Sequence, residues 1–327
     1  MTKSVPRFPN SEMAKQVIES FNDLAWPEYT EDKNVDEFIK EFEKRYFKDL
    51  EALPNIIKIK KPSEFLLPFF RVREFDSIKF KDLVSEYSYP PSHITAIGRC
   101  NFPKRPVFYC SNNPLISLLE TIKDSDFQDK IYCISKWGIN PSEQDLVFEH
   151  FLRSDLHPDN PFKILVDVEK KQLKENFGDV WNDDIEKGFE LIQEFLHNTF
   201  INDEKYGLSA TLAHRTLFAP HNFATDILIY PSVQSKYYGV NMAISPNFVD
   251  QQMHVQRFYL VKVSQIDLDK EEFKFTFVKY GDMDKNKIIW RNISPDDLKY
   301  RDYLLEDFKD YLGDDFDFVF NERKEEI

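Results

Sequence analysis

Phenylalanine accounts for 31 of the 327 residues of this chain, whereas glycine accounts for only 8. So many large apolar side chains can fill a substantial core. The few glycines form neither a G-x-G-x-x-G nor a G-x-x-x-x-G-K-[ST] pattern, which excludes the glycine-rich phosphate loops of Rossmann and P-loop proteins. A ligand that contains phosphate would therefore have to be held by side chains, above all by arginine.

The charge balance and the cysteine and histidine patterns narrow the class of protein further. The chain carries 57 acidic and 43 basic residues, a formal charge of −14, which disfavours nucleic acid as a partner because binding phosphates requires a concentrated basic face. Its three cysteines form no C-x-x-C pair and its seven histidines form no H-x-x-x-H or H-E-x-x-H pair, so neither a disulfide framework nor a metal is predicted. No segment resembles a signal peptide or a membrane-spanning helix. We therefore expect a cytoplasmic protein that binds no membrane.

Hydrophobic spacing predicts groups of helices and strands. Helices are predicted over residues 11–26, 34–50, 114–122, 183–198, 206–218 and 295–312. Strands are predicted over residues 66–72, 106–110, 131–134, 164–166, 226–230, 240–244, 254–263 and 273–277. Strands grouped around interrupting helices favour an α+β fold with a mixed or antiparallel sheet over a regular βαβ arrangement.

Proline and charge patterns divide the chain into three consecutive segments. Pro54 and Pro62 flank a lysine-rich connector, which places a boundary near residue 60. The segments predicted are an N-terminal helical extension over residues 1–60, a catalytic domain over 61–265, and a C-terminal strand and helix extension over 266–327 that packs on the core.

Several polar side chains occur where core packing alone would not require them. The turn Gly98-Arg99-Cys100-Asn101-Phe102-Pro103 offers basic and amide donors and precedes a strand that ends near Tyr109. Glu120 lies in a mostly apolar helix, where a carboxylate needs a partner or a function, and Arg71 and Arg99 are the candidate partners. Ser232 follows a strand, where we expect its hydroxyl at a rim. Each residue alone is ordinarily structural, but together they suit a pocket for an anionic ligand that contains rings, such as a nucleotide.

The order of these motifs resembles the RES domain, a family named for its Arg, Glu and Ser. The matching segments are Phe69-Phe70-Arg71, Gly98-Arg99-x-Asn101, Phe108-Tyr109-Cys110-Ser111, Leu118-Leu119-Glu120, Ile229-Tyr230-Pro231-Ser232 and Gly239-Val240-Asn241-Met242-Ala243. They span roughly residues 65–265. The chain departs from the family pattern at Cys100, where an aromatic residue is usual, and at Lys104-Arg105, which fill the place of a glycine.

The resemblance implies a fold similar to ADP-ribosyltransferases and the activity of a toxin that degrades NAD⁺, which is then a substrate rather than a resident cofactor. It maps the family's Arg, Glu and Ser onto Arg71, Glu120 and Ser232, which we expect to be catalytic. NAD⁺ contacts are expected from the following residues: Arg71, Arg99, Asn101, Tyr109 and Ser232.

The chemistry of NAD⁺ suggests a role for each of these side chains. Nicotinamide is a cationic leaving group, and cleavage of its N-glycosidic bond passes through a state that resembles an oxocarbenium ion. A nearby carboxylate and a firmly held ribose stabilise that state. We expect Glu120 to hold the ribose hydroxyls, the arginines to bind the pyrophosphate, Tyr109 to stack on nicotinamide or ribose, and Ser232 to bond to the ribose or carboxamide. The acceptor is expected to be water or phosphate.

Four other interpretations compete with this one. The same half-reaction can deliver ADP-ribose to a protein side chain. The segment from Arg215 to His221 suggests a ribonuclease of the HEPN type, although Pro220 breaks the helix that this motif needs and the acidic charge opposes RNA. A metal enzyme finds little support in the histidine spacing. A module that binds nucleotides without turnover is the non-enzymatic alternative.

Depletion of NAD⁺ harms a cell, so the resemblance also implies restraint by a neutralising antitoxin or activation by a trigger such as phage infection. Residues 1–60 or the region after residue 265 are the candidates for hosting that control.

Overall fold

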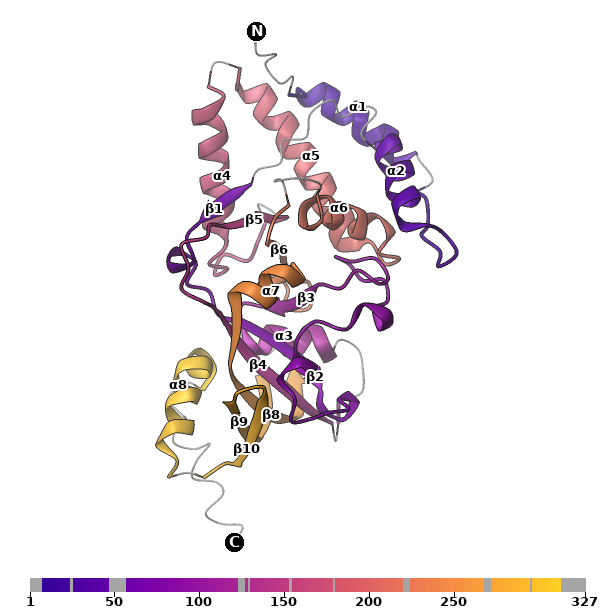
Figure 1. The fold of residues 1–327 in the computed structure, drawn as a ribbon. Coiled ribbons are helices and arrows are strands. Elements are labelled where there is room, and N and C mark those ends of the chain that lie inside the picture. The colour runs from indigo at the N-terminus through magenta and orange to yellow at the C-terminus, as the bar shows by residue number, and fades with distance from the viewer. Residues whose placement is uncertain are drawn as a thin grey trace. The chain divides into compact units, whose positions relative to one another are not determined.

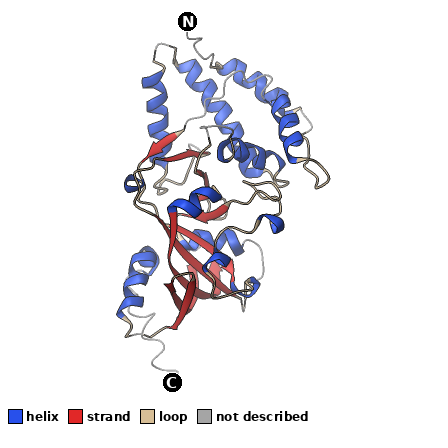
Figure 2. Ribbon diagram, viewed as in Figure 1, coloured by secondary structure: helices blue, strands red, loops and turns tan. Residues whose placement is uncertain are grey.

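The computed structural model describes residues 8–23, 26–46, 57–122, 127–128, 130–152, 155–178, 180–219, 224–267, 272–294 and 296–312 (Figure 1). The chain divides into two units, and both contain helices and strands (Figure 2). The first unit comprises residues 1–66, 89–109 and 141–252, and the second comprises 67–88, 110–140 and 253–327. The α+β class is therefore confirmed.

The units do not follow the three consecutive segments predicted from the sequence. The N-terminal helices share a unit with residues 141–252, and the C-terminal region shares one with two central segments. Each unit is thus assembled from pieces that are distant in sequence.

The first unit contains a small mixed sheet and most of the helices. Its strands are β1 (Lys58–Lys60), β5 (Leu146–His150), β6 (Ile227–Pro231) and β7 (Val240–Ile244), in the order β1-β5-β6-β7. The pairing of β5 with β6 is parallel, and the other two pairings are antiparallel. Its helices are α1 (Ser11–Asn22), α2 (Val35–Tyr46), α4 (Lys163–Asn176), α5 (Asp183–Asn202), α6 (Gly207–Leu217) and α7 (Pro246–Gln252).

Local capping explains where two of these helices begin. The side chain of Asn10 accepts a hydrogen bond from the Met13 amide at the start of α1. Asn182 does the same for Asp184 and Ile185 at the start of α5, whose first turn is acidic and so complements the helix dipole. Both helices bury an apolar face in the same core.

The N-terminal helices pack on the turn that the sequence singled out. Phe102 is fully buried, and its ring lies 5.2 Å from the ring of Tyr29 and 5.9 Å from that of Phe38. Phe38 and Phe42 of α2 belong to the same buried cluster as Phe102. Residues 8–46 therefore form part of the body of the first unit wherever they are described.

The second unit is built on an antiparallel sheet. Its strands are β2 (Phe69–Glu74), β4 (Ile131–Ile139), β8 (Met253–Asp267), β9 (Glu272–Asp284) and β10 (Lys287–Asn292), and Ser111 of β3 (Phe108–Ser111) pairs with Phe70 of β2. From β3 the order runs β2-β4-β8-β9-β10. Its helices are α3 (Pro114–Ile122) and α8 (Leu298–Leu312).

A buried network of charges fixes α8 to the strands of the second unit. The Asp307 carboxylate is fully buried; its Oδ1 lies 2.5 Å from Lys136 Nζ, and its Oδ2 accepts a hydrogen bond of 2.6 Å from the Tyr259 hydroxyl. Arg257 lies 3.2 Å from Asp307 and stacks on the ring of Tyr303. Because the carboxylate has several partners, its burial is compensated.

One predicted strand is wrong, and one predicted helix is present but begins later than expected. Residues 164–166 lie in α4 rather than in a strand: Val166, Glu169 and Leu173 are buried at helical spacing, whereas Ile164 is 64% exposed. The last helix begins at Leu298, because the Asp297 carboxylate accepts a hydrogen bond from the Tyr300 amide and acts as its cap. The end of the helix predicted over residues 34–50 lies outside the described residues.

Candidate functional site

Arg71 lies on β2 in the second unit, between two neighbouring strands. It is paired with Ser135 of β4, whose hydroxyl donates a hydrogen bond of 3.0 Å to the Arg71 carbonyl. The indole of Trp137 in turn donates to the Ser135 hydroxyl over 2.9 Å. Burial raises the pKa of the Cys110 thiol on β3, and the positive charge of Arg71 lowers it in part. The Arg71 carbonyl is thus held by β4, and its charged side chain acts on Cys110 of β3.

Glu120 lies on α3, which packs against β2 in the same unit. The Asn113 side chain caps this helix by accepting hydrogen bonds of 2.8 Å from the Leu115 amide and 3.2 Å from the Ile116 amide. Every residue from Pro114 to Leu119 is buried, whereas Glu120 is half-buried. Thr121 Oγ1 donates to the Ser117 carbonyl and lies 3.4 Å from the Val72 carbonyl. Glu120 precedes Thr121 and Arg71 precedes Val72, so both site residues lie next to this contact between α3 and β2.

Asn101 and Tyr109 belong to the first unit and are bonded to each other. The Tyr109 hydroxyl donates to Asn101 Oδ1 over 2.9 Å and accepts from the Cys100 amide over 2.8 Å. Asn101 Nδ2 donates to the carbonyls of Ala96 and Phe102. The polar groups of both side chains are thus engaged in shaping the turn, which leaves the ring of Tyr109 as the part that a ligand could contact.

Gly98 is the residue that lets this turn close. A Cβ at this position would lie 2.7 Å from Asn101 Oδ1 and 2.9 Å from the Tyr109 hydroxyl, closer than real Cβ atoms approach. Backbone hydrogen bonds in both directions join Gly98 to Asn101. Three residues after Asn101, Lys104 takes a φ of 63°, the left-handed region that favours glycine. A lysine thus takes, in this turn, a backbone conformation that glycine adopts without strain.

Cys100 joins this turn to the strand that precedes Ser232. Its thiol is fully buried and interacts with the hydroxyls of Tyr109 and Tyr230, the latter on β6. Burial raises the pKa of Cys100 to about 12, with Arg99 acting in the opposite direction. A small thiol at this position can pack between two tyrosines, and it is not a reactive nucleophile.

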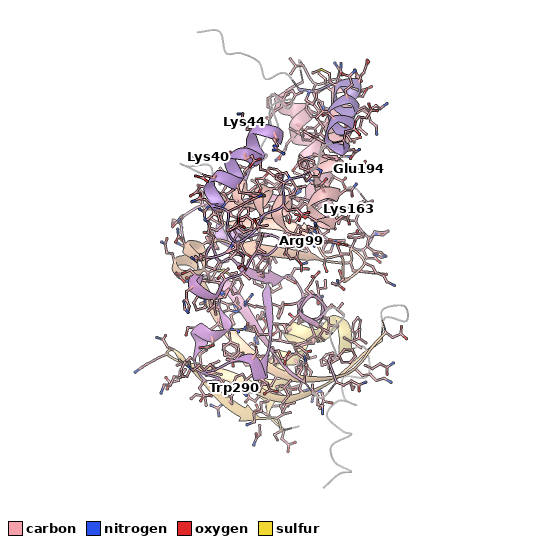
Figure 3. All side chains as sticks on the ribbon, turned by 90° about the vertical axis from the view of Figure 1, so that its right-hand side faces the viewer. Lys40, Lys44, Arg99, Lys163, Glu194 and Trp290 are labelled. Atoms are coloured by element: carbon pink, nitrogen blue, oxygen red, sulfur yellow. The ribbon has the colours of Figure 1, made fainter. Side chains whose placement is uncertain are left out.

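The guanidinium of Arg99 is held at the C-terminal end of α5. Nη1 donates to the carbonyls of Phe200 and Ile201, the latter over 2.6 Å. These carbonyls belong to the last turn of the helix, where no amide of the helix is available to them. Arg99 is one of the side chains labelled in Figure 3. Its Cζ lies 5.9 Å from the centre of the Phe200 ring and 5.6 Å from that of the Tyr206 ring. Arg99 therefore has a fixed orientation.

Ser232 is fully buried, so the expectation that it lies at a rim is wrong. Its Oγ accepts a hydrogen bond of 3.2 Å from the Ser235 amide, and the Ser235 hydroxyl donates back to the Ser232 carbonyl. In the turn that follows, Lys236 and Tyr237 have φ values of 50° and 68°. Two consecutive left-handed residues other than glycine are strained, and such strain is common at functional sites.

The predicted site residues divide between the two units. Arg71 and Glu120 belong to the second unit, where α3 and β2 pack together. Arg99, Asn101, Tyr109 and Ser232 belong to the first, where contacts through Cys100 and Tyr230 link the turn to the strand before Ser232.

Sequence reasoning missed a buried charged cluster in the first unit. Lys58 Nζ and His150 Nε2 lie 2.5 Å and 3.0 Å from the same oxygen of Glu169, and Gln193 donates to the other oxygen over 2.8 Å. Burial alone would raise the pKa of Glu169, but His150 and Lys58 lower it to about 2. The signal was Glu149-His150 at the end of an apolar run, but the strand there was not predicted.

Glu149 is the unusual member of this region. Its side chain is buried, and its Oε2 has no hydrogen-bond partner among the described residues. Burial, together with the negative charge of Glu169, raises its pKa to about 7, and the positive charges of Lys58 and Arg215 act in the opposite direction. It is therefore a carboxyl group that titrates near neutral pH.

The metal and ribonuclease alternatives can be examined in the described part of the chain. No group of three or more His, Cys, Asp or Glu side chains in that part is placed to hold a metal ion. Arg215 lies on α6, which ends at Leu217, and His221 lies outside the described residues. Within the described helices, none is both long and apolar enough to cross a membrane.

Comparison with protein-family models, curated proteins and solved structures found no match to this chain.

Proposed function

We propose that this protein cleaves the bond between nicotinamide and ribose in NAD⁺, and that it has a fold of the ADP-ribosyltransferase type. The observation that carries the proposal is the placement of Glu120. It is a half-buried carboxylate on a helix that is otherwise buried from Pro114 to Leu119, and that helix packs on the strand of Arg71. A carboxylate retained in such surroundings is typical of a functional group rather than of a solvated surface.

The chemistry needs few protein groups. Water attacks C1′ of the nicotinamide ribose, the C1′–N bond breaks, and the electron pair of that bond leaves with neutral nicotinamide. The proton of the water passes to solvent, and the products are ADP-ribose and nicotinamide. Glu120 would hold the ribose hydroxyls and stabilise the positive charge that develops on the sugar. With phosphate as acceptor, the product would be ADP-ribose 1″-phosphate.

The other residues would bind the ligand rather than react with it. Arg99, whose orientation is fixed by α5, is assigned to the pyrophosphate. Asn101 and the Tyr109 hydroxyl would act by shaping the turn, since their polar groups bond to each other and to the backbone. Ser232 would act from a buried position beside the strained turn. An enzyme of this activity would need a neutralising partner or a trigger.

The test is nicotinamide release from NAD⁺ by the purified full chain, with and without phosphate, followed by chromatography. We expect release from the wild type and a loss of at least about 100-fold in Glu120→Gln, because a group that stabilises transition-state charge contributes roughly 3 kcal/mol or more. Glu194→Gln, which alters an exposed carboxylate on α5, should match the wild type. Turnover within a few-fold of the wild type in Glu120→Gln would contradict the assignment. Label from NAD⁺ appearing on a protein would identify a transferase instead.

A further inference from the structure

Arg99 is held as an anion-binding arginine would need to be held. Its hydrogen bonds to described residues all leave from Nη1, and their acceptors are the last carbonyls of α5. Nε and Nη2 donate to no acceptor among the described residues, and the residue is half-buried. The N–H groups on these two nitrogens form one edge of the planar guanidinium, which can bind two oxygens of a phosphate at once.

Tyr206 contributes to this arrangement through its ring and its backbone. Its ring centre lies 5.6 Å from Arg99 Cζ, within the range of a cation–π contact. Its φ is 61° and its ψ is 0°, a left-handed conformation at the residue that precedes α6. A bulky residue is strained in this conformation, whereas glycine adopts it freely. A tyrosine at this position therefore needs a local reason.

The connection between α5 and α6 keeps Tyr206 in place. Asp203 Oδ2 accepts hydrogen bonds of 2.8 Å and 3.0 Å from the amide and hydroxyl of Ser209. The Tyr206 carbonyl accepts the first hydrogen bond of α6, from the Ala210 amide. The backbone strain at Tyr206 is thus balanced by the start of a helix, and the result is a ring directed at Arg99.

We propose that Tyr206 is a positioning residue that orients the guanidinium of Arg99 toward a diphosphate. The proposal rests on the proposed function for the identity of the ligand, but not for the anion site itself. The two α5 carbonyls fix one end of the guanidinium, and the ring restricts its rotation. Arg99 therefore loses less conformational freedom when the anion binds.

The experiment measures binding of inorganic pyrophosphate by ³¹P NMR titration and thermal unfolding of the same full-length proteins. Tyr206→Gly removes the ring and at the same time relieves the left-handed conformation. We expect its affinity for pyrophosphate to fall about 5- to 10-fold, the size of a partly desolvated cation–π contact, while its unfolding temperature stays within a few degrees of the wild type. Tyr206→Phe, which keeps the ring, should bind as the wild type does.

A matched control separates the ring from the backbone. Lys285→Gly relieves a similar left-handed conformation, with φ of 57°, in the turn between β9 and β10 of the second unit. It should leave the affinity unchanged. If Tyr206→Gly lost its fold, Tyr206→Asn, which also tolerates the left-handed region, would replace it.

The measurements test the positioning role of Tyr206, the anion site and the proposed function separately. A weaker affinity in Tyr206→Gly, with normal binding by Tyr206→Phe and Lys285→Gly, supports the positioning role. Equal affinity in Tyr206→Gly and the wild type overturns that role and leaves the proposed function standing. Absence of pyrophosphate binding by the wild type overturns the anion site, whereas nicotinamide release, measured separately, decides the proposed function.

Discussion

Replacing Glu149 by glutamine should make the stability of the protein less sensitive to pH. The carboxyl group is 8% exposed, and burial, with repulsion from Glu169, raises its pKa from 4.5 to about 7. Between these two values the folded state holds a proton that the unfolded state releases. Stability is therefore lost as the pH rises toward and through the folded-state pKa, whereas glutamine does not titrate.

The size of the effect follows from the two pKa values. The unfavourable contribution of Glu149 is about 1 kcal/mol at pH 5 and about 3 kcal/mol at pH 8, because each pKa unit corresponds to about 1.4 kcal/mol. The free energy of unfolding of Glu149→Gln, relative to the wild type, should therefore increase by about 2 to 3 kcal/mol between these pH values. Attraction to Lys58 and Arg215 is already contained in the folded-state pKa.

Urea denaturation at pH 5, 6, 7 and 8 measures this difference. Glu194→Gln serves as the control because its carboxylate is exposed, and its difference from the wild type should not vary over the same range. A difference between Glu149→Gln and the wild type that stays constant from pH 5 to pH 8 would refute the reasoning. It would mean that Glu149 is ionised in the folded state throughout, with its charge compensated.

Two substitutions near the candidate site should change stability in opposite directions. Lys104→Gly should stabilise the fold by about 1 kcal/mol, because φ of 63° costs a lysine strain that glycine does not feel; a lower unfolding temperature would contradict this. Gly98→Ala should destabilise it by roughly 1–3 kcal/mol, because the added Cβ would lie 2.7 Å from Asn101 Oδ1 and displace a buried hydrogen bond. Chemical denaturation measures this loss of stability. An unfolding midpoint equal to that of the wild type would show that the turn accommodates the Cβ without loss of stability.

The elements that sequence reasoning predicted best are those with strong local signals. The helix from Pro114 to Ile122 was predicted to the residue, because Asn113 and Pro114 mark its start. The strand from Val240 to Ile244 was also predicted to the residue. Both are short apolar runs with clear boundaries, and tertiary packing did not need to override them.

The elements that it missed depend on distant partners. Residues 164–166 are apolar and favour a strand when considered alone. Glu169, three residues later, is buried and paired with Lys58 and His150, which are distant in the sequence. The helix is therefore stabilised by an ion pair that no local pattern contains. The strand from Leu146 to His150 was missed for a related reason, since it ends in two titratable residues, of which His150 is paired with Glu169 of α4.

For the site, the sequence identified candidate residues but not the hydrogen-bond partners of their polar groups. Asn101 and Tyr109 look alike in the sequence as ligand-binding residues, yet their hydrogen bonds join them to each other and to the backbone. Arg99 looks like a free cation, yet part of its guanidinium caps a helix. Such assignments require the direction of each donor, which a sequence does not specify.

Cys100 and Lys104 in the same turn follow the same principle. Cys100 is buried between the hydroxyls of two tyrosines, where an aromatic ring would need more volume than a thiol. Lys104 has a left-handed backbone conformation, in which a glycine would not be strained. In this turn, backbone hydrogen bonds in both directions join Gly98 to Asn101. The backbone of this turn carries Arg99 to the end of α5, so the conformation of the turn, rather than the two side chains, determines where the guanidinium lies.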